Sequence, residues 1–343
     1  MNNKQKPTPG GNDSAPGKKR QKKVPWWRLA LGLCLLLVLM FFLVDLETAW
    51  RHLRQADPIF LFWLLLLLTA DRLLMSWKWT LLLSCRGIAL GQFPALKAYY
   101  LGTFAGSFLP TTLGSDALRV AAVSGLERPS EVVAASVIME RGLGLAASAL
   151  AALLALLLLT ELATHAPPGR LAWTLGLTLV LAALIVLGML WSLSRGGGRL
   201  AVRLQERLHK RGRVARWLGR LAEAYHEYRQ HPLLLGLFLL LSFLEQMVPV
   251  LANWLSARAL GIELSLLAAA AATPVAMTLA RLPVWFSAFG VVEGLFVFFF
   301  SLVGVGATQA FLLGLSTNIF SLLAALPGLF FYLAGGLHAE GDR

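Results

Sequence analysis

The feature that most constrains this chain is the recurrence of apolar runs long enough to cross a lipid bilayer. A transmembrane helix needs about 20 predominantly apolar residues. Runs near or above that length cover residues 29–46, 59–83, 131–159, 171–193, 233–256 and 308–333. Three shorter or interrupted runs cover residues 95–113, 265–282 and 288–304. The pattern predicts a polytopic membrane protein.

Composition supports this interpretation. Charged residues make up 14% of the chain and hydrophobic residues 57%, whereas a soluble domain carries about 25% charged residues. We therefore expect an all-α bundle of about six to eight spanning helices. The first apolar run is too long for the core of a cleavable signal peptide, and Asp45 and Glu47 close it without a small-residue cleavage site.

The net charge of +13 is concentrated in two segments. Residues 1–28 hold eight Lys/Arg and one acid, a net +7, and residues 194–232 hold ten Lys/Arg and three acids, again +7. Basic loops stay on the cytoplasmic side of a membrane, so both segments are predicted to be cytoplasmic. Basic runs also occur in nucleic-acid-binding proteins, but nothing here resembles such a fold. We expect no nucleic-acid partner.

These segments suggest a domain organisation. It comprises a disordered basic tail (1–28), an N-terminal transmembrane half (29–193), a basic amphipathic linker (194–232), a C-terminal transmembrane half (233–335) and a short tail (336–343). Leu200, Leu204 and Leu208 recur every four residues in the linker, which fits a helix lying on the cytoplasmic surface. A solvated connector fits equally well. We expect a multi-pass protein of the inner (cytoplasmic) membrane with a cytoplasmic N-terminus.

Charge placement predicts one re-entrant segment. Five crossings before residues 194–232 would put that basic segment outside, so one run does not cross. The weakest candidate is 95–113, which carries Gly102, Gly106 and Pro110. We infer that roughly residues 97–126 enter from the cytoplasmic side and return to it, lined by protein or by a water-filled cavity.

A similar break occurs in the other half. Residues 282–294 read LPVWFSAFGVVEG, so a Pro is followed by a Gly and then an acid, as in FLPTTLGSD at 108–116. The spacings differ, so the symmetry is weak, but paired Gly/Pro-broken segments point to the central site of a transporter. The second segment should enter from the opposite face, as in an inverted repeat. The predicted loop-forming residues are Pro110, Gly114, Ser115, Pro283, Gly290 and Gly294.

Ionisable residues at membrane depth mark the predicted site. Each isolated charge costs about 2.5–3.5 kcal/mol on insertion scales, so such residues pair, face water or both, and indicate function by default. Ten are predicted at this depth: Asp71, Arg72, Lys78, Asp116, Arg119, Glu140, Arg141, Glu245, Arg281 and Glu293. Of these, the substrate-binding set is predicted to be Asp71, Arg72, Asp116, Arg119, Glu140, Arg141, Arg281 and Glu293.

Local spacing predicts some of their contacts. Asp116 and Arg119 are three residues apart and therefore neighbours on one helix face. Ser115 is a candidate N-cap, and the helix it starts would aim free N–H groups into the cavity. The adjacent acid–base pairs at 71–72 and 140–141 diverge by about 100°, so we expect them to pair across helices. For Lys78 and Glu245, a role in locking helices together is an equal alternative.

The tryptophans, cysteines and histidines indicate no further functional site. The tryptophans, Trp79 among them, mostly lie at the ends of apolar runs and are interpreted as interfacial anchors. Cys34 and Cys85 offer neither a disulfide framework nor a metal-binding spacing. The histidines form no ligand pair. We expect no metal site and no cofactor.

At these motifs the chain resembles the lysylphosphatidylglycerol synthase-like transmembrane region, also called the flippase-like domain family. The matching segments are 71–87, 99–119, 132–145, 282–296 and 326–333. The family pattern has Pro-Gly and Gly-Gly-Asp where this chain has Pro110-Thr111 and Gly114-Ser115-Asp116. The resemblance implies translocation of lipids between leaflets. It also implies that the synthase chemistry lies in a separate cytoplasmic domain, which we do not expect here.

Three functions remain open at this point. The first is a flippase for an anionic or aminoacylated phospholipid or a lipid-linked sugar, because Arg holds phosphate through two parallel hydrogen bonds. The second is a membrane transferase using Asp116, Glu140 or Glu293 as a base. The third is an accessory subunit of an envelope-lipid complex. The flippase function predicts a protein that is not an enzyme. The sequence leaves open whether the protein forms homo-oligomers.

Overall fold

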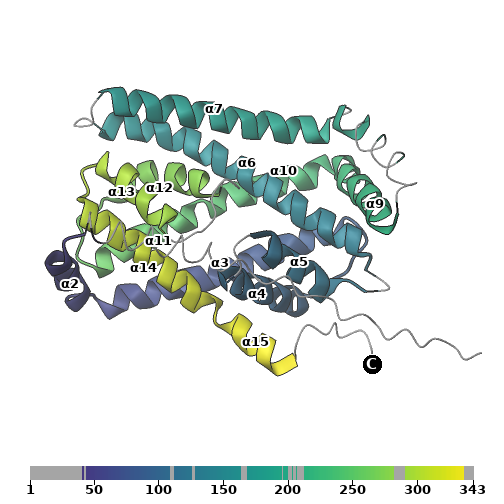
Figure 1. Ribbon diagram of the computed structural model, residues 1–343, viewed down its shortest axis with the longest axis horizontal. Helices are drawn as coiled ribbons and strands as arrows, with labels where there is room; N and C mark the ends of the chain where they lie inside the picture. Colours follow the sequence, from purple (N-terminus) through teal and green to yellow (C-terminus); the bar gives the residue numbers. More distant parts are fainter. Residues whose placement is uncertain are drawn as a thin grey trace, which may run out of the picture.

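The computed structural model describes residues 41, 44–108, 112–125, 128–163, 168–194, 196–199, 203, 206, 212–281 and 290–335. Within these residues every regular element is a helix (Figure 1). The N-terminal helices are α2 (Leu46–Arg54), α3 (Pro58–Ser84), α4 (Gln92–Phe108), α5 (Thr112–Val123), α6 (Ser130–Leu162) and α7 (Pro168–Leu193). The others are α9 (Arg213–Glu227), the 3-10 turn η1 (Tyr228–Gln230), α10 (Pro232–Glu245), α11 (Met247–Ala259), α12 (Leu266–Ala280), α13 (Val291–Ser301), α14 (Ala307–Ala325) and α15 (Pro327–Gly335).

The prediction of an all-α polytopic membrane protein is confirmed. In the described part of the chain, five stretches are long and apolar enough to cross a membrane: Pro58–Ser84, Ser130–Leu162, Leu171–Leu193, Pro232–Ala259 and Ala307–Leu333. They match five of the six long predicted runs. The remaining run, 29–46, lies almost wholly outside the described residues.

Prolines break two of these stretches. α10 ends at Glu245 and α11 starts at Met247, just before Pro249, whose missing N–H removes the hydrogen bond to residue 245. α14 ends at Ala325 and α15 begins with Pro327. The predicted runs 233–256 and 308–333 are therefore each formed by two consecutive helices.

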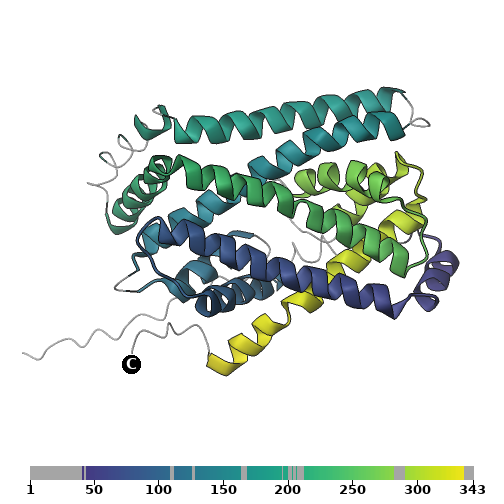
Figure 2. The same ribbon diagram turned by 180° about the vertical axis from the view of Figure 1, so that it is seen from behind.

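The bundle has two ends, named here the α2 end and the α9 end (Figure 1). The backbone N–H of Asp57, just before α3, donates to Ala259 O at the end of α11 at 2.8 Å. The hydroxyl of Tyr228, just before α10, donates to Leu82 O near the end of α3 at 3.0 Å. α3 and α10–α11 therefore run antiparallel, side by side, between the two ends (Figure 2).

Two pairs of shorter helices enter this bundle from opposite ends. The first hairpin, α4 and α5, follows the end of α3 and so starts at the α9 end. The second hairpin, α12 and α13, follows the end of α11 and so starts at the α2 end. Two broken segments entering from opposite ends is the arrangement that the sequence predicted.

Small residues allow close packing in both halves. In the first hairpin, a Cβ added at Gly106 would lie 2.7 Å from Ser115 Cβ. Around the second hairpin, α12 packs on α6 through buried alanines such as Ala269 and Ala272, and Ser148 and Thr278 hydroxyls share a hydrogen bond of 2.6 Å. Small residues with a polar contact are the usual means of joining helices in a membrane.

The C-terminal helix α15 packs against α4. Gly328 is needed there, because an added Cβ would lie 2.3 Å from Tyr100 O. Phe331 then contacts the rings of Phe93 and Tyr100, with centroid distances of 6.0 and 6.3 Å. Since Phe93 is near the start of α4, α15 runs toward the α9 end, the same end as the described part of the basic linker.

The described part of the basic linker includes α9, which packs on α6. The Trp217 indole donates to Ser130 Oγ at 2.9 Å, and Arg220 pairs with Glu131 at 2.7 Å. Helices from the two predicted transmembrane halves also interleave, because α3 contacts α11 and α6 contacts both α10 and α12. The domain boundaries predicted from charge stay predictions.

Candidate functional site: an ionic cluster between the two hairpins

A buried ion pair joins the first hairpin to α6. Arg119 on α5 and Glu140 on α6 are 5% and 8% exposed. Arg119 Nη2 lies 2.8 Å from Glu140 Oε2, and Nη1 donates to Oε1 at 3.2 Å. One hydrogen bond and one closer contact between opposite charges therefore join the two groups, and a hydrogen bond between charged groups is stronger than a neutral one.

Aromatic rings enclose this pair. The guanidinium carbon of Arg119 lies 4.7 Å from the Trp79 ring centroid and 4.6 Å from that of Tyr99, within cation–π range. The Tyr99 hydroxyl donates to Glu140 Oε1 at 2.7 Å. Trp79 is fully buried, so its assignment as an interfacial anchor is wrong. Trp79 lies near the end of an apolar run, and this position alone does not reveal that α4 and α5 pack over its ring.

The second pair differs from the one that spacing suggested. Arg141 Nη2 donates to Asp116 Oδ1 at 2.8 Å, so Asp116 pairs with α6 rather than with Arg119. The prediction of local Asp116–Arg119 pairing is wrong, because α6 offers each of them an opposite charge. For the adjacent residues 140 and 141, pairing across helices is confirmed. Arg141 keeps a side-chain exposure of 45%.

Ser115 is not an N-cap. α5 begins at Thr112, so Gly114 and Ser115 lie inside its first turns. Ser115 instead packs against α4, where a Cβ added at Gly102 would lie 3.0 Å from Ser115 O and one added at Gly106 would lie 2.7 Å from Ser115 Cβ. Pro110 lies outside the described residues.

A third pair ties α3 to α10. The ammonium of Lys78 contacts Glu245 Oε2 and donates to Ser242 Oγ at 3.0 Å, and it lies 5.0 Å from the Phe238 ring centroid. Lys78 is only 3% exposed, so it does not extend to the membrane surface. For Lys78 and Glu245 the sequence left a role in locking helices together as an equal alternative, and these two residues pair with each other.

Asp71 and Arg72 lie beside these pairs. Arg72 Nη2 is 3.8 Å from Asp71 Oδ2, so the two adjacent residues contact each other, contrary to the expectation that they pair only across helices. The charge of Asp71 also interacts with those of Lys78 and Arg281. Arg281, the C-cap of α12, is exposed and donates to Gln246 Oε1 at 3.1 Å. One residue of the second hairpin therefore reaches the cluster.

Glu293 does not share these contacts. It is fully buried, and its carboxylate accepts the Gly290 N–H at 2.7 Å and the Asn318 amide at 2.8 Å. Gly290 has φ +83°, a conformation that favours glycine, and Gly294 N–H bonds to its carbonyl at 3.0 Å. Within the described residues Glu293 caps α13 and ties it to α14. Pro283 lies outside the described residues.

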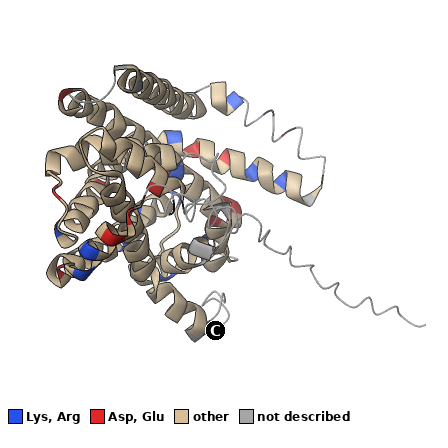
Figure 3. Ribbon diagram, turned by 60° about the vertical axis from the view of Figure 1, so that its left-hand side comes forward, with Lys and Arg blue, Asp and Glu red and all other residues tan. Residues whose placement is uncertain are grey.

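We name the charged residues gathered here the ionic cluster. Its members are Asp71, Arg72, Lys78, Asp116, Arg119, Glu140, Arg141, Glu245 and Arg281. Most of the bundle carries neither acids nor bases (Figure 3). Four buried polar atoms of the cluster make no hydrogen bond among the described residues: Asp71 Oδ1, Arg72 Nε, Arg119 Nε and Glu140 Oε2.

Sequence reasoning missed the uncharged members of the site. Tyr99, Ser242 and Gln246 each bind a charged side chain of the cluster. The available signals were the polar Gln246 next to Glu245 in an apolar run, and Tyr99 at the start of the segment 99–119. Neither signal identifies which charge is bound.

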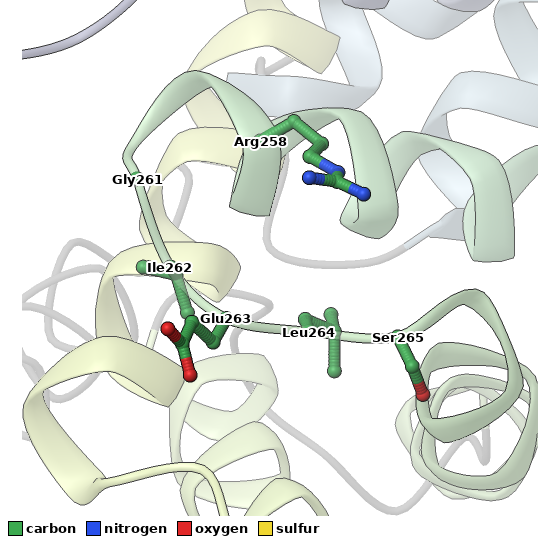
Figure 4. A pocket seen from close by; sticks show the side chains of 6 residues that line it. All are labelled: Arg258, Gly261, Ile262, Glu263, Leu264 and Ser265. Atoms are coloured by element: carbon green, nitrogen blue, oxygen red, sulfur yellow. The ribbon is translucent and has the colours of Figure 1, made fainter.

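A shallow pocket lies away from the cluster, at the turn between α11 and α12 at the α2 end (Figure 4). It is lined by Arg258, Gly261, Ile262, Glu263, Leu264 and Ser265. None of these is a predicted site residue. Arg258 instead lies over the Trp254 ring, 5.4 Å from its centroid, and Ser265 caps α12.

One of three comparisons with known proteins found a match. No curated protein matches the chain, and no solved structure does. The family model described as lysylphosphatidylglycerol synthase TM region matches residues 26–328. That range contains the whole ionic cluster and both hairpins. This multi-pass membrane protein therefore belongs to the lysylphosphatidylglycerol synthase TM region family.

Proposed function

We propose that the protein moves a phospholipid or lipid-linked headgroup between the leaflets of the cytoplasmic membrane. Membership of a membrane-lipid family supports this coarsely. The observation that carries it is the ionic cluster, which combines buried pairs with two accessible arginines, Arg141 and Arg281. An anionic headgroup would be attracted by these arginines while its acyl chains stay in the hydrocarbon.

The hairpins suggest how such a site is reached from both sides. They enter from opposite ends, and the cluster lies on the helices between them. In our proposal, the α9 end faces the cytoplasm because it carries the basic linker. The pairs Lys78–Glu245 and Arg119–Glu140 would hold the helices together while an anionic group exchanges among Arg72, Arg141 and Arg281.

A transferase would need a carboxylate free to act as a base. Among the carboxylates suggested for that role, Glu140, Asp116 and Glu293 already accept hydrogen bonds from Tyr99 and Arg119, from Arg141, and from Gly290 and Asn318, respectively. This engagement favours transport over catalysis, and we propose that the protein is not an enzyme.

The test uses the full chain reconstituted in vesicles that carry a trace of fluorescent phosphatidylglycerol or phosphatidylcholine in both leaflets. Chemical quenching from outside measures exchange between leaflets. We expect faster exchange of the anionic lipid with protein than without it. Exchange should fall at least tenfold for Arg281→Gln and for Arg119→Lys, which keeps the charge but loses the planar fork.

Arg258→Gln is the matched control, because Arg258 lies over Trp254 outside the cluster. It should exchange lipid like the unmodified chain. Unaccelerated exchange of both lipids in the unmodified chain, or equal losses in the Arg258 and Arg281 variants, would contradict the proposal.

A further inference from the structure

Asp71 differs from every other carboxylate of the ionic cluster. Glu140, Glu245 and Asp116 each accept at least one hydrogen bond from a basic side chain. Asp71 is 8% exposed, its Oδ1 is buried without a hydrogen-bond partner among the described residues, and its Oδ2 lies 3.8 Å from Arg72 Nη2. A buried carboxylate without hydrogen bonds is unstable as an anion unless nearby positive charge compensates it.

The compensating charges come from two sides. Arg72 and Lys78 belong to α3 itself, and Arg281 comes from the second hairpin. Several other charged or titratable groups on the packed helices bind one another: Tyr99 of α4 and Arg119 of α5 with Glu140 of α6, Asp116 with Arg141, and Glu245 of α10 with Lys78. α4 also carries Lys97 and Tyr100, and α6 also carries Glu161 and Glu131, the latter paired with Arg220 of α9. α14 carries no charged residue, and Arg258 of α11 lies at the α2 end. Asp71 therefore depends on two arginines, Arg72 and Arg281, and on Lys78, which it shares with Glu245.

An anionic headgroup would compete for the same two arginines. The cluster contains five basic and four acidic side chains within the described residues. When an anion binds Arg72 and Arg281, the carboxylate of Asp71 loses its compensation and gains a like-charged neighbour. Like charges that share a site favour protonation of one of them. Proton uptake then restores the original charge of the cluster.

We propose that Asp71 is a proton-binding site that couples lipid movement to proton movement, one proton for each anionic headgroup. This inference rests on the proposed function for its lipid but names a separate, proton-binding activity. The proton enters from water on one side, resides on the Asp71 carboxyl while the headgroup occupies the arginines, and leaves to water on the other side. No covalent bond other than O–H forms or breaks.

The first experiment measures proton binding without requiring transport. The full chain in weakly buffered maltoside micelles receives glycerophosphoglycerol, a phosphodiester with one negative charge, as a soluble headgroup probe, while a pH indicator and infrared spectroscopy follow the proton. We expect uptake of one proton per bound anion and a new C=O stretch of a protonated carboxyl. Asp71→Asn should bind the anion without either signal, and Asp71→Glu should recover both.

The second experiment measures coupling in vesicles. With one proton per lipid, a pH difference of one unit is expected to drive a roughly tenfold leaflet asymmetry of labelled phosphatidylglycerol. Asp71→Asn should show none. Glu263→Gln, which changes a carboxylate in the pocket at the α2 end, should behave like the unmodified chain. Retained thermal stability of the Asp71→Asn protein separates loss of coupling from loss of fold.

The outcomes separate the two proposals. Lipid exchange that ignores the pH gradient, or proton uptake unchanged in Asp71→Asn, overturns the proton site while the proposed function stands. Proton uptake that depends on Asp71 without exchange of any lipid supports the proton site and contradicts the flippase. If the unmodified chain shows neither proton uptake nor a carboxyl signal, the inference is wrong.

Discussion

The two hairpins of this protein enter from opposite ends but differ in what they bring to the centre. The first hairpin contributes a buried arginine, Arg119, locked to α6 and covered by Trp79 and Tyr99. The second hairpin contributes Arg281, exposed at the end of α12, while its acid, Glu293, serves as a helix cap. Similar sequence breaks can therefore build a fixed half and an accessible half of one site.

The largest expected effect concerns the opposite entry of the hairpins. In a chain with Cys34 and Cys85 replaced by Ala, Gly91→Cys marks the start of the first hairpin and Glu263→Cys that of the second. Because these positions lie at opposite ends of the bundle, a membrane-impermeant maleimide added to intact cells should label only Glu263→Cys. If both positions are labelled in intact cells, or if neither is labelled until the cells are lysed, the two hairpins do not enter from opposite sides.

The next effect concerns the two arginines. Arg119→Ala leaves Glu140 buried without its partner, so we expect a loss of about 3–5 kcal/mol in unfolding free energy. Arg281→Ala removes an exposed side chain but also one of the charges that compensate Asp71, so we expect a smaller loss than for Arg119→Ala. Thermal or denaturant unfolding in micelles measures both.

A double replacement sharpens this result. Arg119→Met with Glu140→Gln removes both charges but keeps an acceptor for the Tyr99 hydroxyl, so it should lose less stability than Arg119→Ala alone. If the double variant loses as much stability as Arg119→Met and Glu140→Gln lose separately, added together, the two residues are not coupled.

Replacing a closely packed glycine should destabilise the protein more at the first hairpin than at the second, and this difference in unfolding free energy should be smaller than that between the two arginine variants. At Gly106 an added Cβ meets Ser115 Cβ at 2.7 Å, whereas at Gly314, against the second hairpin, it meets Glu293 Cα at 3.2 Å. Gly106→Ala should therefore destabilise by about 1–3 kcal/mol, and Gly314→Ala by less. Gly144→Ala, where nothing lies within 4 Å, is the control and should be neutral or stabilising. Equal losses at residues 106 and 314 would contradict the close approach of α4 and α5.

The smallest expected effect is at Glu293. Glu293→Gln keeps one oxygen acceptor for Gly290 N–H or Asn318 but not both, so it should cost about 1 kcal/mol. Lipid exchange should persist, because Glu293 lies outside the ionic cluster. Loss of exchange with full stability would return Glu293 to the substrate-binding set in which the sequence placed it.

Much of the fold followed from the sequence, because burial in a bilayer is decided locally along the chain. The apolar runs located five described spans to within a few residues, and the Gly/Pro breaks located both hairpins. The local rules failed where a partner came from elsewhere. Spacing paired Asp116 with Arg119, but α6 supplied the opposite charges. Spacing also made Ser115 an N-cap, but α5 begins at Thr112 and Ser115 packs against α4.

The class of protein and the length of its membrane helices followed from the sequence alone, since each depends on residues within about one helix length. The depth of the charged residues in the membrane stays a prediction. The pairing of the charged residues depends on the three-dimensional packing, because the partners are 21 residues apart for Arg119–Glu140 and 167 apart for Lys78–Glu245. The tertiary structure also places α15 along α4, running toward the α9 end, and leaves Asp71 as the one acid of the cluster that accepts no hydrogen bond from the described residues. These are properties of distances between helices, which no single stretch of sequence contains.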